Sequence, residues 1–415
     1  YNMSVISHRE RLAEMLDDNC MLLLYSGVAL HVSQDEYYPF RVNRNFFYLT
    51  GLSAENMLLF MTKRGGRTLS TLYIEEPDPY NIRWTGKMIT AEEAKEISGI
   101  EDVRYTDRID GDISAYMAYD TTETVWFDCQ RHSLSDLPDY NLEKAGDFMR
   151  KYPYVKLRNL HTPLAKLRRV KDEDEVALMR GAVAVTKAGL ERVMSTLRPG
   201  MYEYMAQAEF EYEIACCGAE GTSFPTIAGA GPNGTMLHYE TNREICRDGD
   251  LLLLDLGAKT NGYCADTRTY PINGKYTDRQ RSYYDIVLAA NREVARQARP
   301  GITTRELNEI CKDVLADGLI KMGKIADRSE LSKYYMHGVS HHIGIDVHDA
   351  DIAEGKELCE GAIISDEPGL YIDEEGIGIR IEDDLLITGN GCEVLSADII
   401  RDPDEIERFM AENRK

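Results

Sequence analysis

The chain has 415 residues, of which 71 are acidic and 48 basic, so its formal net charge is −23 at pH 7. This balance excludes the basic surface that nucleic-acid binding needs, and an anionic membrane would repel the chain. No stretch offers the roughly 20 consecutive apolar residues of a membrane helix, and we expect no secretory leader because the first residues lack an apolar core. The length predicts two or three globular domains.

Residues 1–165 are predicted to form a mixed α/β domain. Short apolar or β-branched segments bounded by turn residues are typical of strands, and they are expected at 21–27, 56–62, 70–76, 124–129 and 155–160. Helices are expected between them. One begins at Thr90, because Glu93 stands at the spacing of a capping box.

The segment 40–52 is rich in aromatic residues and carries Arg41 and Arg44 among its rings. We interpret it as a core strand with solvated ends.

A change of character between 161 and 175 predicts the domain boundary. A proline is followed by dense alternating charge and then by a long helical pattern. We place the boundary near 165–172, which gives domains at 1–165 and 172–415, and no long flexible linker separates them.

The second domain contains a weak internal repeat, in which 197–218 resembles 298–319. Each copy follows a long helix, breaks it with Pro-Gly and starts a new amphipathic helix. A strand region, histidines and a hairpin are expected after each copy. This pattern predicts two similar halves packed as a pseudo-symmetric α/β domain.

The first predicted hairpin, 249–271, carries one pair of acidic residues. With a four-residue loop at 259–262, Asp255 and Asp266 would lie directly opposite each other. Opposed residues on one face of a hairpin have Cβ atoms about 5 Å apart.

The second predicted hairpin, 367–384, repeats this arrangement. A loop at 373–376 would place Glu367 opposite Glu382. Two buried carboxylates at that distance repel, so both pairs need a compensating charge, and two divalent cations would supply it. The competing interpretation, solvated acids near strand ends, fits four matched positions between apolar segments less well.

Histidines gather between the hairpins. Four of the nine lie in 337–349: His337, His341, His342 and His348. Gly338 and Gly344 disfavour a helix there, so we expect an extended segment that supplies one metal ligand and further proton-transfer groups. Carboxylate-rich sites suit manganese, magnesium or calcium, and an added imidazole shifts the preference toward transition metals. His238 precedes the first hairpin, and the sequence favours a structural and a functional role for it equally.

These residues resemble the pita-bread metallopeptidases, specifically the aminopeptidase P (Xaa-Pro aminopeptidase) and prolidase branch, over essentially the whole chain. The matching motifs are the Asp of LLDLGA, the Asp of GYCAD, the His of HGVSHHIG, the Glu of DEPGLY and the Glu of GIRIED. NRNFFYLTGL and Trp84 resemble the creatinase-type N-terminal domain. The resemblance therefore implies that domain, followed by a pita-bread catalytic domain.

The resemblance also implies the metal ligands. Asp255 would bind one ion alone, Asp266 and Glu382 would bridge two ions, and His341 and Glu367 would complete the second. The family commonly uses two manganese ions with a bridging water or hydroxide, and cobalt or zinc is possible.

Further roles are implied for residues around the metals. Glu367 would act as general base, and His337 and His348 would stabilise the tetrahedral intermediate and hold substrate carbonyls. His238 and Arg380 match residues that lie near the substrate.

Three positions depart from the family pattern or need explanation. One residue is missing between Asp266 and Thr269, which puts the strand register there in question. Asp366 stands beside Glu367, is expected to face away from the metals, and is costly if buried without a partner. Cys264 could bring a thiol near the site, although a packing role is favoured.

The implied activity is release of the first residue from peptides with proline in second position. Prolidase, which accepts only dipeptides, is the nearest alternative. Methionine aminopeptidase is a further alternative, but it lacks the large N-terminal domain. A metal-free creatinase-like hydrolase would not need all five ligands, and a non-catalytic pita-bread binding module should have lost some of them. The resemblance suggests a homodimer or higher oligomer.

Cysteine usage bears on the compartment. The nine cysteines are scattered singly except for Cys216-Cys217, and no Cys-x-x-Cys pair exists. We therefore expect neither a disulfide framework nor a zinc knuckle. A cytoplasmic location is expected, because its reducing conditions keep thiols free.

Overall fold

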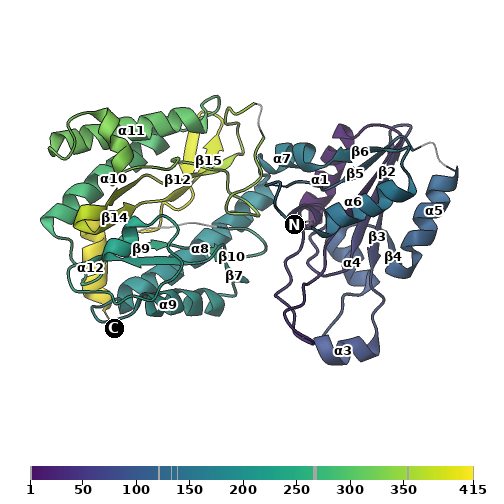
Figure 1. The fold of residues 1–415 in the computed structure, drawn as a ribbon, viewed down its shortest axis with the longest axis horizontal. Helices are drawn as coiled ribbons and strands as arrows, with labels where there is room; N and C mark the ends of the chain where they lie inside the picture. Colours follow the sequence, from purple (N-terminus) through teal and green to yellow (C-terminus); the bar gives the residue numbers. More distant parts are fainter. Residues whose placement is uncertain are drawn as a thin grey trace. The chain divides into compact units, whose positions relative to one another are not determined.

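The structure is a computed structural model that describes residues 2–119, 122–131, 133–137, 139–264, 269–352 and 355–414. The chain divides into two compact units, Tyr1–Leu167 and Arg168–Lys415 (Figure 1). Among the described residues, no helix has the length and apolar character needed to cross a membrane.

The N-terminal unit is built on a six-stranded sheet with the order β4-β3-β2-β1-β5-β6. Its strands are β1 (Cys20–Tyr25), β2 (Leu58–Arg64), β3 (Arg67–Ile74), β4 (Asp102–Tyr105), β5 (Thr124–Phe127) and β6 (Lys156–Asn159). β2 runs antiparallel to both of its neighbours, whereas the β3–β4, β1–β5 and β5–β6 pairs are parallel. All five expected strands are present, and β4 is an additional one.

Helices flank and connect the strands of this unit along the sequence. They are α1 (Asn2–Met15), α2 (Arg44–Thr50), α3 (Pro79–Thr85), α4 (Ala91–Ser98), the 3-10 turn η1 (Thr106–Arg108), α5 (Ile109–Tyr119), α6 (Tyr140–Lys151) and α7 (His161–Arg168). Apolar side chains of α5 and α6 form one core with β1, β2 and β5. The predicted capping box at the start of α4 is confirmed, because Thr90 and Glu93 bond each other's backbone N–H groups.

The predicted core strand at 40–52 is wrong, since its centre forms α2. The Asn43 side chain accepts the N–H of Phe46 and caps the helix start. Gly51 ends the helix in a left-handed conformation, with φ of 71°, which glycine adopts without steric cost. These local caps outweigh the strand preference of the aromatic residues.

The C-terminal unit has two pairs of helices, as the internal repeat predicts. Its helices are α8 (Glu173–Thr196), α9 (Glu203–Cys216), the turn η2 (Gly231–Thr235), α10 (Asp278–Gln297), α11 (Thr304–Lys321), the turns η3 (Arg328–Lys333) and η4 (Asp373–Glu375), and α12 (Pro403–Asn413). α8 packs on α9 and α10 packs on α11, and a Pro-Gly step separates the members of each pair. α9 contacts the strands of the first half, and α10 contacts those of the second (Figure 1).

Short strands form the centre of this unit. They are β7 (Gly221–Thr222), β8 (Ile227–Ala230), β9 (Leu251–Asp255), β10 (Ala258–Lys259), β11 (Thr269–Pro271), β12 (Ile363–Asp366), β13 (Gly369–Ile372), β14 (Ile377–Arg380), β15 (Asp383–Thr388) and β16 (Gly391–Val394). The described strands pair as β11-β9-β8, β12-β15-β16, β13-β14 and β10-β7.

The predicted register of the second hairpin is confirmed. β13 and β14 are antiparallel, with Gly369 opposite Arg380 and Ile372 opposite Ile377. The same register, continued beyond the strand ends, sets Glu367 opposite Glu382.

The predicted four-residue loop of the first hairpin is wrong. Thr260 bridges Tyr263, so the turn consists of Asn261 and Gly262, which both have positive φ. This Asn-Gly pair is the one that two-residue turns favour. Farther along, Thr269 pairs with Leu253, one residue away from the expected register. Asp266 lies outside the described residues, so its pairing with Asp255 stays a prediction.

Candidate metal centre and active site

Two glutamates from the second hairpin begin the site. Glu382, between β14 and β15, is 2% exposed, and Glu367 lies between β12 and β13. The hydroxyl of Ser365 donates to Glu367 Oε1 at 3.3 Å. Burial raises the pKa of Glu367 to about 7, with the Asp255 carboxylate acting in the same direction and Arg380 against it. A carboxyl group with that pKa can exchange a proton near neutral pH.

His341 adds an imidazole to these carboxylates. Its Nε2 lies 3.3 Å from Glu367 Oε1 and 3.9 Å from Glu382 Oε1. The expected extended backbone is present beside it, where His342 bridges Ile364, but the chain bends at 344–348. The N–H of His341 donates to Ser365 Oγ at 2.9 Å. Burial lowers the pKa of His341 to about 4, so the ring is neutral at pH 7 and keeps a lone pair for a metal.

Asp255 approaches from the end of β9. Its Oδ2 forms an ion pair with Arg380, whereas its Oδ1 is buried without a hydrogen-bond partner in the described part of the chain. Asp266, the other aspartate implied as a ligand, is not among the described residues.

The residues present fit divalent metal ions. One donor atom each from His341, Glu367 and Glu382 can be chosen so that all lie within 4.8 Å of one another. The unsatisfied Asp255 Oδ1 is a further oxygen donor beside them, since Asp255 lines the same cavity. Oxygen donors with one imidazole match manganese and related transition metals.

This donor set opens into a cavity of about 440 Å³, the size of a small-ligand site. The cavity brings together all the described candidate residues: His238, Asp255, His337, His341, His348, Glu367, Arg380 and Glu382. His342, by contrast, is not among the residues that line it; this side chain is buried and lies 3.8 Å from Asp351.

His337 and Arg380 are joined through a tyrosine that the sequence reasoning missed. Arg380 donates to the Tyr371 hydroxyl at 2.9 Å, and that oxygen lies 2.8 Å from His337 Nε2. Its position on the same strand face as Glu367, four residues away, was the available signal. The other ring nitrogen of His337 lies 2.7 Å from the carbonyl of Gly338.

His348 and His238 are the exposed histidines of the cavity. The His348 ring packs edge-on against that of His341, with 4.4 Å between centroids. Burial lowers the pKa of His348, and His238 acts in the same direction.

The positions that departed from the family pattern have structural partners. Asp366 is fully buried and accepts a hydrogen bond from the Asn291 amide at 3.2 Å. Thr269 Oγ1 donates to the carbonyl of Arg380 and accepts its N–H, both at 3.0 Å, which supports the strand behind the cavity. Cys264 is buried, and its thiol lies 3.5 Å from the Ile345 carbonyl, as the packing interpretation expects.

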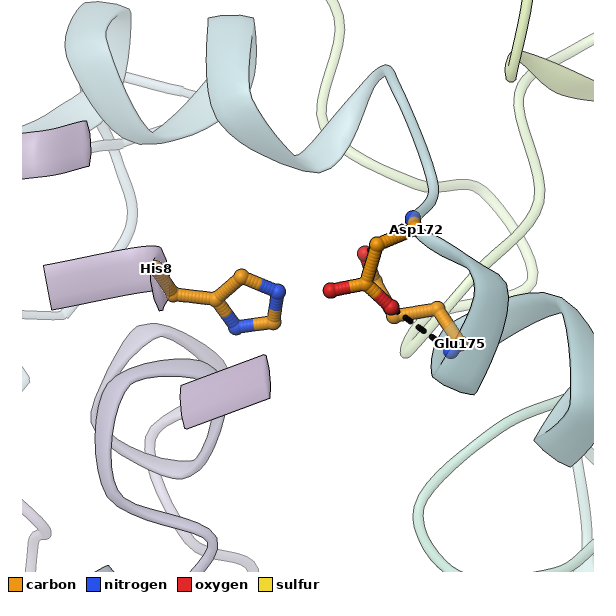
Figure 2. Close-up of side chains that lie close together, drawn as sticks. All are labelled: His8, Asp172 and Glu175. Carbon is orange, nitrogen blue, oxygen red and sulfur yellow. Dashed lines mark hydrogen bonds between the residues drawn. The ribbon is translucent and has the colours of Figure 1, made fainter. Parts of the chain in front are cut away.

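A second group of potential ligands has structural roles instead. Figure 2 shows Asp172 at the start of α8, where its carboxylate accepts the N–H of Glu175 at 2.9 Å. Glu175 returns a bond to the N–H of Asp172 and also accepts the hydroxyl of Tyr263. His8, labelled in the same figure, belongs to the N-terminal unit, where its Nδ1 lies 2.9 Å from the Tyr48 carbonyl. We assign no metal to these residues.

Comparisons with known proteins show the family of the chain. Residues 177–389 match the model of metallopeptidase family M24, and residues 5–126 match that of the aminopeptidase P N-terminal domain. The Xaa-Pro aminopeptidase of Escherichia coli (strain K12) is 33% identical, over 98% of this chain and 97% of that protein. A solved Bacillus anthracis structure named for aminopeptidase P is 40% identical with a TM-score of 0.96, covering 100% and 99% of the two chains. Zinc-substituted E. coli aminopeptidase P in complex with product is 31% identical with a TM-score of 0.90, covering 100% and 99%.

Proposed function

The chain belongs to metallopeptidase family M24, in its Xaa-Pro aminopeptidase branch, and we propose that it releases the first residue from peptides whose second residue is proline. The observation that carries this proposal is one cavity in which carboxylates and a neutral imidazole meet three further histidines and a buried arginine. Metal-dependent peptide hydrolysis needs such a combination of metal donors and proton-transfer groups.

We assign the metal ligands to Asp255, Asp266, His341, Glu367 and Glu382, and the metals to two divalent ions, manganese first. Bound there, such ions would supply the Lewis acidity that activates a water and polarises the scissile carbonyl. Their opposite charge also stabilises carboxylates that are otherwise crowded together.

Glu367 is the proposed general base. It takes a proton from the attacking water and passes it to the leaving nitrogen of proline. Its carboxylate lines the cavity and lies 3.3 Å from His341 Nε2, so a water held at the proposed metals would be within its reach.

His337 is the proposed donor to the oxygen on which negative charge develops. Both of its ring nitrogens already have partners, Tyr371 and the carbonyl of Gly338. Donation to substrate therefore requires exchange of one of these bonds. Tyr371 and Arg380 hold the ring in place for that exchange.

His238, His348 and Arg380 are the proposed substrate contacts. The nitrogen of a proline residue is a tertiary amide without an N–H, so a pocket must recognise the ring by shape. His238 and His348 line the cavity with exposed side chains that an incoming peptide can reach.

The remaining assignments concern organisation. We assign 1–165 to the aminopeptidase P-type domain and 172–415 to the catalytic domain, and we assign the working protein to a cytoplasmic homodimer or higher oligomer. Nine free cysteines are consistent with a reducing compartment.

A substrate panel tests the activity. The purified chain is stripped with a chelator, reloaded with manganese and offered Xaa-Pro dipeptides, Xaa-Pro-Yaa peptides and peptides without proline. We expect cleavage of Xaa-Pro-Yaa between the first two residues. Cleavage of dipeptides alone would indicate a prolidase, and equal cleavage of peptides without proline would refute both functions.

A further inference from the structure

The loop between the two ring-packed histidines of the cavity is closed on itself. The backbone N–H of Asp349 donates to the carbonyl of His342 at 2.8 Å, so the loop leaves and returns at the same place. This closure sets His348, the residue before Asp349, against the ring of His341. The position of His348 thus depends on what holds Asp349.

Asp349 is held by two buried cations from the segment that precedes α8. Lys171 Nζ donates to its Oδ2 at 3.0 Å, and Arg168 forms an ion pair with its Oδ1. The side chains of Asp349, Lys171 and Arg168 are 2%, 1% and 5% exposed. Arg168 also donates to Asp346 at 2.8 Å, which ties a second point of the loop to the same cation.

Two features show that the cluster of Asp349, Arg168 and Lys171, called the clamp below, is tightly packed. A Cβ at Gly344 would collide with Asp349 Oδ2, so the loop backbone reaches the ion pair only because Gly344 has no side chain. Burial alone would raise the pKa of Asp349, but Arg168 and Lys171 outweigh it and hold the pKa below its usual value. The carboxylate is therefore charged, and its two partners compensate it.

We infer that Asp349, clamped by Arg168 and Lys171, is the positioning residue that fixes His348 at the cavity for contact with the peptide. The inference rests on the proposed function, because His348 is a substrate contact only in that function. Asp349 does not line the cavity and acts through His348.

A double-mutant cycle separates positioning from general support. Asp349→Asn is made in the wild type and in a His348→Ala background, and kcat and KM are measured on an Xaa-Pro-Yaa peptide. We expect Asp349→Asn to lower kcat/KM about tenfold in the wild type, mainly through KM, as the loss of one well-placed polar contact does. In the His348→Ala background the further loss should be under about twofold. Equal losses in both backgrounds, or no loss in the wild type, would overturn the inference.

Two variants guard against misfolding. Asp351→Asn is the matched control, because Asp351 lies two residues farther on, is half exposed and is 3.8 Å from Arg169; it should leave kcat and KM unchanged. Asp349→Asn could fail to fold because it leaves Lys171 charged and buried. The cycle is then run with Asp349→Asn combined with Lys171→Met, which removes the charges of Asp349 and Lys171 together.

A second readout does not depend on activity. In the zinc-loaded protein, whose metal is diamagnetic, the imidazole resonances of His348 should shift or broaden in Asp349→Asn and stay unchanged in Asp351→Asn. Unchanged resonances in Asp349→Asn would contradict positioning. If the wild type does not cleave Xaa-Pro peptides but the His348 resonances still differ between it and Asp349→Asn, only the proposed function is refuted.

Discussion

Glu367 has a mostly buried side chain, 16% exposed, whose carboxylate lies beside Ser365 and His341, and these contacts determine what a substitution should do. Glu367→Gln keeps the size of the side chain but removes its basicity and weakens a metal donor. We expect kcat to fall at least about 100-fold, the usual worth of a general base. The measurement is steady-state cleavage of an Xaa-Pro-Yaa peptide after manganese loading, with the metal content of each protein determined.

Glu374→Gln is the control, because Glu374 lies at the tip of the same hairpin and its side chain is 53% exposed. It should retain wild-type kcat. Full activity of metal-loaded Glu367→Gln would remove Glu367 from the proposed role.

Individual residues of the site were predictable from sequence to different degrees. Glu367 and Glu382 could be paired, because one hairpin register relates them over a short loop. Tyr371 was missed because its contact with His337 spans 34 residues, and no local pattern encodes such a contact. Long-range side-chain geometry of this kind requires the fold.

At the scale of elements, the hairpin β13–β14 depends on a close backbone approach to η2. A Cβ on Gly378 would collide with the carbonyl oxygen of Gly234, which cannot move without displacing η2. We expect Gly378→Ala to destabilise the C-terminal unit by about 3 kcal/mol or more, since overpacking against backbone has no easy relief. Denaturant unfolding followed by circular dichroism measures the loss.

Gly391→Ala is the matched control on another strand, β16, where an added Cβ meets nothing within 4 Å. Its effect should stay within about 0.5 kcal/mol. Similar stability of the two variants would contradict the close approach.

The same scale explains which elements could be predicted. The strands of the N-terminal unit and the long helices carry strong local patterns and were found. The prediction of the first hairpin was wrong because Asn261-Gly262 makes a tighter turn than expected and because β10 pairs with β7. The helix α2 was not predicted because its caps, Asn43 and Gly51, stand among aromatic residues that favour a strand.

For the whole molecule, the formal charge of −23 has two parts with different consequences. Most acidic residues lie at the surface, where salt screens their repulsion. The carboxylates of the proposed ligands Asp255, Glu367 and Glu382 line one cavity, where Arg380 compensates one of them, and bound divalent cations would relieve their remaining repulsion. Two divalent ions would reduce the formal charge by four units, all of it at this cavity, so metal binding and folding of the C-terminal unit should be linked.

Chelation should therefore lower thermal stability as well as activity. At a metal concentration about 100 times the dissociation constant, bound metal adds roughly 2.7 kcal/mol, which corresponds to a melting temperature higher by roughly 5 to 10 °C. Scanning calorimetry of the manganese-loaded and chelated chain measures this difference. Glu382→Gln, which weakens the buried donor set, should melt at nearly the same temperature with and without chelator. A melting temperature of the unsubstituted chain that chelation leaves unchanged would contradict the linkage, because buried carboxylates brought this close cannot all stay charged at no cost.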